Sequence, residues 1–260
     1  MQAQLNKMVS IIMLSRNMGR FVQESVRSIQ EQTYQDWELL FVDDSSNDDT
    51  VHQLMELKDN DPRIKVTKTV YHRGDGNNRN SALRQAKGRW IAFLNCGDLW
   101  DPEKLEKQIR LMEGQCCSFS YTKYRIIDEQ GRDRGYVMGG PKRVTYQDMM
   151  KCCWLGYATV MYDREKVGLQ QVKYLEENND YALWLMISDK HDCVLLDECL
   201  VSYRLMKPIP MHLMTSRKLG WRYEVYRKVE DLGVLESAYL SVRNLWYSGV
   251  KWLKYAKRNS

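Results

Sequence analysis

Short apolar runs alternate with amphipathic helical segments through the first hundred residues, and this alternation constrains the fold more than any other feature of the chain. Four runs are too short for helices, namely VSIIML (9–14), ELLFV (38–42), IKVTKT (64–69) and WIAFL (90–94). The first of them is apolar on both faces, as a buried parallel strand should be. The order strand, helix, strand, helix predicts an α/β fold with a mostly parallel sheet, flanking helices and right-handed crossovers.

Two helices of this region carry residues that are typical of helix ends. NSALRQAKG (80–88) reads as a short helix, and Gly88 occupies the position of a left-handed C-cap. Asp101 and Pro102 are the residue types expected at an N-cap and at a first helical position. We therefore expect the next helix to begin at Pro102.

The middle of the chain has a different pattern. Residues 116–124 and 157–162 alternate between polar and apolar side chains, as half-exposed strands do. DYALWLMISDK (180–190) predicts a helix, which two short strands should follow, CVLLD (193–197) and LVSYR (200–204).

The chain changes character near Lys207. Residues 1–206 carry the α/β pattern, whereas residues 207–260 read as a helical C-terminal extension that is dense in aromatic and basic side chains. Two interpretations of this extension remain open. Residues 236–260 contact a membrane surface, as interfacial helices of this composition do, or their aromatic side chains pack against the α/β domain while the cations are solvated.

Composition narrows the class of protein. A net charge of +5 is too mild to imply a nucleic-acid partner, and we expect none. The seven cysteines show no CxxC spacing, which indicates a reducing compartment rather than a disulfide framework. No apolar stretch approaches the roughly 20 residues that a membrane-spanning helix needs, and the first residues lack a signal peptide's apolar run. These features predict a cytoplasmic protein and leave open a peripheral location at the inner face of the cytoplasmic membrane.

Polar side chains follow the predicted strands at the points where open parallel sheets bind ligands, just beyond the carboxyl ends. Neither the GxGxxG of a dinucleotide site nor the GxxxxGK[ST] of a P-loop is present. Asp43 or Asp44 can instead hold a nucleotide by accepting a hydrogen bond from a base N–H, or both residues simply cap the next helix. The candidates are Ser15 and Arg16 after the first strand, Asp43 and Asp44 after the second, and Asn95 and Asp98 after the fourth.

Four ordered motifs resemble inverting glycosyltransferases of family 2, which have the GT-A fold. The motifs are VSIIMLSRN, WELLFVDDSSNDDT, RNSALRQAKGRWIAFLN followed by GDLWDPEKL, and NDYALWL, and the resemblance covers roughly residues 8–205. It implies that residues 1–206 form a nucleotide-sugar-dependent glycosyltransferase domain. It also implies transfer of a hexosyl or N-acetylhexosaminyl group, usually from a UDP sugar, to a saccharide or lipid-linked saccharide. The product would belong to a bacterial surface polysaccharide such as O-antigen, capsule or lipopolysaccharide.

The resemblance assigns a role in nucleotide-sugar binding to Arg79 and to the strand-end candidates, Asn95 and Asp98 included. The Asp-Asp pair of the family is intact as Asp43 and Asp44, and Asp44 would bind the uracil. Ser15 keeps a hydroxyl for the nucleoside, and Arg16 replaces an aromatic residue, although a guanidinium plane can also stack on a base. Arg79 matches an arginine that faces the donor, where it would neutralise the diphosphate. The alternative is that Arg79 is a solvated residue at a helix start.

The resemblance also points to the catalytic base. In the family, the second acid of a pair that precedes Tyr-x-Leu-Trp deprotonates the acceptor, and Asp180 occupies this position. Asn179 replaces the first acid of the pair. The chemistry needs only one base within about 3 Å of the acceptor hydroxyl. The alternative is that Asp180 is an N-cap for the helix that follows.

The turn after the fourth strand departs most from the family. The usual Asp-Ser-Asp-Asp is replaced by Asn95, Cys96, Gly97 and Asp98, so one carboxylate remains for Mn²⁺ or Mg²⁺. Cys96 is a poor ligand for either ion because a thiolate is soft. Three interpretations stay open: a weakened metal site at Asp98, a metal-free enzyme that relies on Arg79 and helix termini, or a non-catalytic nucleotide-sugar-binding protein with a degenerate metal site.

Overall fold

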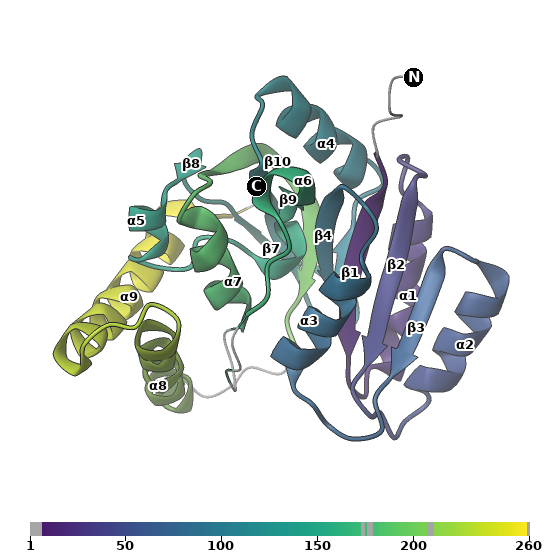
Figure 1. Ribbon diagram of the computed structural model, residues 1–260, viewed down its shortest axis with the longest axis horizontal. Coiled ribbons are helices and arrows are strands. Elements are labelled where there is room, and N and C mark those ends of the chain that lie inside the picture. The colour runs from purple at the N-terminus through teal and green to yellow at the C-terminus, as the bar shows by residue number, and fades with distance from the viewer. Residues whose placement is uncertain (1–6, 173–174, 176–178, 207–210, 259–260) are drawn as a thin grey trace.

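The N-terminal half of the chain forms a parallel sheet in the computed structural model, which describes residues 7–172, 175, 179–206 and 211–258 (Figure 1). The strand order is β3–β2–β1–β4, and each neighbouring pair is parallel. The α/β prediction with a mostly parallel sheet is confirmed, because the longest ladders of paired residues are parallel. The strands are β1 (Val9–Ser15), β2 (Trp37–Asp43), β3 (Ile64–Lys68) and β4 (Trp90–Asn95).

Helices cover both faces of this sheet. One hydrophobic core lies between the sheet and α1 (Gly19–Gln30), α2 (Thr50–Asn60) and α4 (Lys104–Gly114). A second core lies on the opposite face, against α3 (Asp75–Gln85) and α7 (Asn179–Ser188). Figure 1 shows α1 and α3 on opposite sides of the strands. The strands are buried on both faces, which explains their continuous apolar runs.

The alternation of side chains along β1 shows how one strand serves both cores. Ile11 and Met13 belong to the core under α1, whereas Ile12 belongs to the core under α3, and none of the three is exposed. Successive side chains of a strand point to opposite faces of the sheet, so an uninterrupted apolar run fills both layers.

The second half of the sheet is mixed. The strand β9 pairs antiparallel with β4 and β6, and β10 runs parallel to β6. Figure 1 shows these strands continuing the sheet beyond β4. The strands are β5 (Leu99–Trp100), β6 (Phe119–Ile127), β7 (Asp133–Met138), β8 (Arg143–Val144), β9 (Met161–Asp163) and β10 (Cys193–Arg204), with short helices α5 (Tyr146–Met149), η1 (Tyr157–Thr159) and α6 (Arg164–Val167).

Two strand predictions were wrong in detail. The segments 193–197 and 200–204 form one strand, because register shifts accommodate the exposed residues between them without ending the pairing with β6. The predicted strand 157–162 begins as the helical turn η1. Its cause is Thr159, whose N–H and hydroxyl both donate to the carbonyl of Gly156, at 3.0 and 2.7 Å.

Two helix ends also differ from the prediction. The helix expected at 80–88 begins at Asp75 and ends at Gln85, and Gly88 is not a left-handed C-cap. Gly88 is needed for a close approach instead, because a Cβ there would lie 2.5 Å from the carbonyl oxygen of Met8. The helix predicted to start at Pro102 begins at Lys104, where the N–H donates to the carbonyl of Asp101.

The predicted C-terminal helices are α8 (Met211–Lys228) and α9 (Val234–Tyr255), which lie side by side at one end of the molecule (Figure 1). The expectation that the helix continues to residue 260 was wrong, because residues 256–258 form β11 (Ala256–Arg258) and pair with β7. The proposed boundary near Lys207 falls outside the described residues. The division into two domains stays a prediction.

A buried polar network joins these helices to α7. The hydroxyls of Tyr181 and Tyr226 lie 3.0 Å apart, and the amide Nδ2 of Asn244 donates to both, at 3.0 and 2.9 Å. Tyr226 and Leu240 belong to the same core as α7. One face of α8 and α9 therefore packs against α7. Within the described part of the chain, no helix is long and apolar enough to cross a membrane.

Candidate active site

The register of the sheet brings the predicted donor residues to one edge. Ser15 pairs with Asp43, and Leu14 pairs with Asn95, so β1, β2 and β4 end at the same level. Ser15 is buried and Arg16 is exposed at this edge. In open α/β sheets, ligands bind in the crevice beyond this edge.

Asp43 closes the loop after β2. Its carboxylate accepts hydrogen bonds from the backbone N–H and the hydroxyl of Ser46, and this hydroxyl accepts the N–H of Asn17 at 2.8 Å. The interpretation that Asp43 and Asp44 cap the next helix was wrong, since α2 begins at Thr50. Asp43 instead fixes the loops after β1 and β2 against each other.

Asp44 organises the loop between β3 and α3. Its carboxylate accepts the hydroxyl of Thr69 at 3.1 Å and the N–H groups of Arg73 and Gly74 at 2.9 and 3.3 Å, and it also contacts Nδ1 of His72. Burial alone would raise the pKa of Asp44, but these bonds and the side chain of Asn78 outweigh burial and lower it. A carboxylate has about four acceptor positions, and all are taken here. The uracil contact at Asp44 therefore stays a prediction that requires part of this loop to move.

Arg79 is a buried cation beside Tyr157. Its side chain is 5% exposed, and its guanidinium lies 4.9 Å from the ring centre of Tyr157, with Nε 3.4 Å from the hydroxyl. Burial lowers the pKa of Arg79, but nearby Tyr157 and Asp180 outweigh burial and raise it. Among the described residues, no carboxylate forms an ion pair with Arg79 and its Nη1 has no hydrogen-bond partner. The alternative of a solvated arginine was wrong, because the side chain is buried.

Asp180 is held at the crevice by the helix that follows it. It lies in the first turn of α7, and Trp184, one turn later on the same face, packs edge-on against Phe93 of β4 with ring centres 5.1 Å apart. The helix begins at Asn179, so the structure does not place Asp180 at the N-cap. No residue within the described ranges forms an ion pair or a hydrogen bond with the Asp180 carboxylate.

Asp180 and Asn95 line one cavity of about 300 Å³. Three tyrosines, Tyr124, Tyr157 and Tyr203, line the same cavity, and the rings of Tyr124 and Tyr203 meet edge-on with centres 5.9 Å apart. A cavity with aromatic walls, one amide and one carboxylate that has no partner among the described residues can hold a sugar hydroxyl beside a base.

Asp98 holds the turn after β4 in place through hydrogen bonds to Asn95 and to the end of β10. Its carboxylate is 3% exposed and accepts the backbone N–H of Arg204 at 2.9 Å and the amide of Asn95 at 3.0 Å. The side chain of Arg204 donates to the carbonyl of Gly97 at 2.7 Å and pairs with Glu24. Gly97 has a φ of 108°, a conformation that favours glycine. The strand β10 therefore fixes this turn through Arg204.

These residues fit a structural turn better than a metal site. Among the described residues, no group of three or more Asp, Glu, His or Cys side chains is placed to hold a metal ion. Both oxygens of Asp98 already accept protein hydrogen bonds. Burial raises the pKa of the Cys96 thiol to about 12, so this sulfur stays protonated and does not act as a ligand. The metal role of Asp98 stays a prediction.

The burial of Asp98 predicts a pH-dependent stability. Burial raises its pKa from the ordinary 3.8 to about 7, and the bonds from Arg204 and Asn95 offset this only in part. The unfolded chain therefore loses this proton at a lower pH than the folded chain. The stabilising effect of protonated Asp98 is complete below pH 4 and is lost as the pH rises towards 7, by up to about 1.4 kcal/mol per pH unit.

The substitution Asp98→Asn removes this titration and keeps an acceptor for the N–H of Arg204. We expect the stability of the variant relative to the natural chain to increase by about 1 kcal/mol or more between pH 5 and pH 7.5. Urea unfolding of both proteins at the two pH values measures the difference. A difference that does not change with pH would show that Asp98 is ionised in the folded protein throughout.

Sequence reasoning missed Arg204 and Tyr157. Arg204 ends β10, so an inspection of every strand end, rather than of the first four, would have found it. Tyr157 lies in the segment that was assigned to a strand, and no local pattern indicates that its hydroxyl meets Arg79, 78 positions away.

Comparisons with known proteins identify the family of the chain. The family model described as Glycosyl transferase family 2 matches residues 10–166, more than half of the chain. The chain is 34% identical over 238 residues to the putative teichuronic acid biosynthesis glycosyltransferase TuaG of Bacillus subtilis (strain 168), covering 91% of this chain and 94% of that protein. It is 39% identical over 180 residues to WfgD of Escherichia coli, a UDP-Glc:alpha-D-GlcNAc-diphosphoundecaprenol beta-1,3-glucosyltransferase, covering 69% of each.

Solved structures show the same fold. TarS residues 1–349 from S. aureus, in complex with UDP-GlcNAc, superimposes with a TM-score of 0.65 at 18% identity, over 91% of this chain and 71% of that one. The mannosyltransferase PcManGT from Pyrobaculum calidifontis, in complex with GDP-Man and Mn²⁺, gives 0.66 at 16% identity, over 96% and 74%. The chain has the GT-A fold; it belongs to glycosyl transferase family 2 and is a glycosyltransferase.

Proposed function

We propose that this glycosyltransferase moves a sugar from a UDP-linked donor to an acceptor hydroxyl with inversion, in bacterial surface polysaccharide synthesis. One observation carries the proposal: Asp180, which has no ion pair or hydrogen bond to another described residue, lines a cavity together with Tyr157, whose hydroxyl contacts the buried Arg79. The names of the relatives supply the rest. WfgD uses a UDP sugar and a diphosphoundecaprenol-linked saccharide, and TuaG is named for teichuronic acid biosynthesis.

The donor would lie across the ends of β1 and β2. Arg79 would donate its open N–H to the diphosphate and stabilise the charge that develops as the nucleotide leaves. Ser15 would contact the nucleoside and Arg16 would stack on the base from the exposed edge. Asp43 would support this site through the loop that it closes, and Asp44 would reach the base only after its own loop releases it.

Asp180 would act as the general base. It would remove the proton from the acceptor hydroxyl as this oxygen attacks the anomeric carbon, while the diphosphate leaves from the opposite face. One displacement of this kind inverts the anomeric configuration. Asn95, in the same cavity, can donate a hydrogen bond to the sugar, and the faces of Tyr124 and Tyr203 can cover the C–H groups of its ring.

A divalent cation, Mn²⁺ or Mg²⁺, would supply additional charge at the diphosphate, as the Mn²⁺ in the PcManGT structure suggests. Asp98 is the candidate ligand. Its carboxylate is buried and each of its oxygens accepts a hydrogen bond from the protein, which favours a role in holding the turn after β4 instead. Arg79 would supply positive charge to the diphosphate.

The alternative is a non-catalytic nucleotide-sugar-binding protein, and the replacement of an acid by Gly97 favours it. The enzyme would release nucleotide from the donor, whereas the binding protein would not. Purified protein is incubated with a panel of nucleotide sugars and saccharide acceptors, with and without Mn²⁺, and nucleotide release is measured. Release that depends on the acceptor supports the enzyme, whereas donor binding without release for every pair supports the binding protein.

We also propose that α9 rests on the inner face of the cytoplasmic membrane. Large apolar side chains on this helix are exposed by 62–90% and recur at intervals of three, four or seven, so they share one helical face. The exposed Lys254 lies next to Leu253 at the end of this stripe, which suits an anionic lipid surface. A lipid-linked acceptor would then be presented from the same surface. The stripe consists of Leu235, Tyr239, Val242, Trp246 and Leu253.

The double substitution Trp246→Ser and Leu253→Ser tests this contact. Burying each side chain is worth about 1.5–3 kcal/mol, so we expect the partition onto vesicles containing phosphatidylglycerol to fall more than tenfold in a flotation assay. Deletion of 236–260 is a poorer test, because it also removes the buried Asn244. Met55→Ser, an exposed apolar residue on α2, is the control. Equal flotation of all three proteins would argue against the membrane contact.

A further inference from the structure

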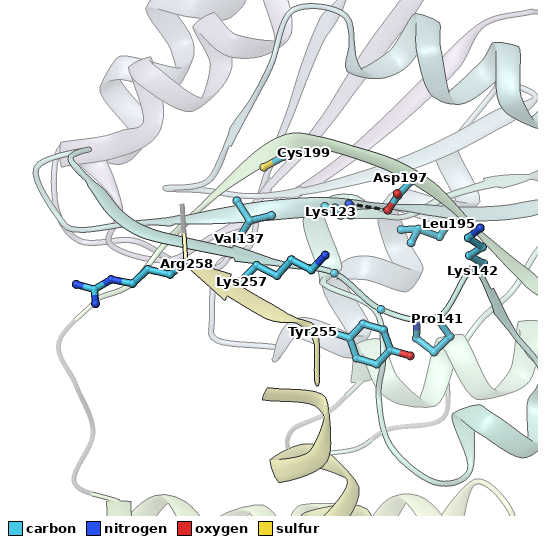
Figure 2. Close-up of a pocket in the computed structure, with 12 residues that line it drawn as sticks. Lys123, Val137, Pro141, Lys142, Leu195, Asp197, Cys199, Tyr255, Lys257 and Arg258 are labelled. Carbon is cyan, nitrogen blue, oxygen red and sulfur yellow. Dashed lines mark ion pairs between the residues drawn. The ribbon is translucent and has the colours of Figure 1, made fainter. Parts of the chain in front are cut away.

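A second cleft, separate from the active-site crevice, lies where the C-terminal strand returns to the sheet (Figure 2). Its volume is about 630 Å³. The strand β11 forms one wall by pairing with β7, and side chains of β6 and β10 line the cleft as well. Of the described residues that line it, none lines the cavity that contains Asp180.

The cleft carries an excess of positive charge. Lys123 pairs with Asp197, the one acid among the lining residues, at 2.6 Å. Lys142 and Lys257 are exposed, and neither forms an ion pair with another described residue. Figure 2 shows Lys257 extending along the cleft towards Lys123 and Lys142 lying beyond Asp197, whereas Arg258 points away. Ammonium groups gathered without matching carboxylates repel one another, and an anion between them would relieve this repulsion.

The walls of the cleft are fixed by contacts of their own. The N–H of Gly139 donates to the carbonyl of Tyr255 at 3.2 Å, and the ring of Tyr255 packs edge-on against Trp154, with centres 5.8 Å apart. A Cβ at Gly140 would lie 2.4 Å from the hydroxyl of Tyr121, so this strand connection passes too close for any other residue. The spacing of the lysines therefore rests on a defined backbone and not on a loose loop.

We propose that this cleft binds a phosphate-bearing anion through Lys142 and Lys257. An ammonium group on a long side chain binds phosphate oxygens as a point charge and adapts to their position. A diphosphate fits the charge of two otherwise unpaired lysines better than a neutral saccharide does. Two sources share this chemistry, a soluble phosphate compound and the headgroup of an anionic phospholipid, and the cleft begins at the end of the helix that carries the apolar stripe.

The test compares the double variant Lys142→Ala and Lys257→Ala with a charge-matched control, Arg27→Ala and Lys58→Ala, in exposed positions on α1 and α2. Calorimetric titration with inorganic pyrophosphate measures the soluble source. Flotation with vesicles of phosphatidylcholine, with and without phosphatidylglycerol, measures the lipid source. We expect the cleft variant to bind one of these probes about tenfold more weakly than the control does, and the loss to shrink at high salt. Pyrophosphate that binds outside this cleft should bind the cleft variant and the control equally, so it does not contribute to the difference between them.

A third variant, Lys142→Arg and Lys257→Arg, keeps the charge and should restore binding. Weaker pyrophosphate binding by the cleft variant assigns a soluble phosphate, and weaker flotation only with phosphatidylglycerol assigns a headgroup. Circular dichroism and thermal unfolding confirm that all variants fold. If the cleft variant and the control bind both probes equally, or if the natural chain binds neither, the proposal is wrong. The result is independent of sugar transfer, because neither lysine lines the active-site cavity.

Discussion

The substitution Asp180→Asn should reduce the rate of sugar transfer by about 10²–10⁴-fold, the usual contribution of a general base. An amide of nearly the same shape keeps the helix start and the cavity but accepts no proton at neutral pH. The side chain is only partly exposed and forms no ion pair with the described residues, so its removal should leave folding intact. Steady-state kinetics with saturating donor and acceptor measure the loss.

Two controls make this result specific. Asp189→Asn makes the same chemical change just after the other end of α7 and should leave the rate unchanged. The affinity of the Asp180→Asn variant for UDP should also equal that of the natural chain, since the proposed donor contacts lie at Ser15, Arg16 and Arg79. A variant that transfers sugar at more than a tenth of the natural rate would remove Asp180 from the role of base.

The substitution Arg79→Met should reduce the transfer rate by about 10²–10³-fold, the effect of removing one preorganised donor to a developing negative charge. Methionine fills a similar space beside Tyr157 without leaving a buried charge. The distinguishing readout is UDP affinity. We expect it to fall about tenfold in this variant, because Arg79 would contact the diphosphate of product and donor alike.

Arg84→Met, an exposed position on the same helix, is the matched control and should change neither rate nor affinity. Arg79→Lys should retain part of the activity, since a lysine keeps the charge but not the planar group. If Arg79→Met lowers the rate and leaves UDP affinity unchanged, Arg79 acts by positioning the groups around Asp180 and not by binding the diphosphate.

The layers of the fold could be predicted from the sequence because buried strands and helix faces have apolar residues at regular local spacing. The alternation of Ile11, Ile12 and Met13 between two cores is visible in the apolar run itself. The same is true of the strand ends, so Ser15, Asp43 and Asn95 were expected at one edge and were found there. Where a side chain depends only on its own strand or helix, its place can be predicted.

Contacts between distant segments could not be predicted in the same way. Gly88 was read as a helix cap, although its small size serves a close approach to Met8. The position of Asp44 at a strand end was predicted, but the donors that the loop after β3 supplies to its carboxylate were not. In each case, a segment from elsewhere in the chain decides what the residue does.

The C-terminal helices were predicted as helices, but their packing was not. Their aromatic and basic composition was consistent with packing and with a membrane surface, and the structure shows packing on one face and exposed apolar side chains on the other. Composition does not reveal which face each side chain occupies. The buried contact of Asn244 with Tyr181 also places α9 one residue from the proposed base, so changes in this helix can reach the active site.

The most direct test of the account is acceptor-dependent transfer from an α-linked UDP sugar, followed by determination of the new linkage by NMR. UDP-glucose with an acceptor of the N-acetylglucosaminyl diphospholipid type, as in the name of WfgD, is the first pair to measure. The account predicts release of UDP only when acceptor is present, a β-linked product, and loss of both in Asp180→Asn. Binding of UDP sugars without release across all acceptors, or an α-linked product, would contradict it.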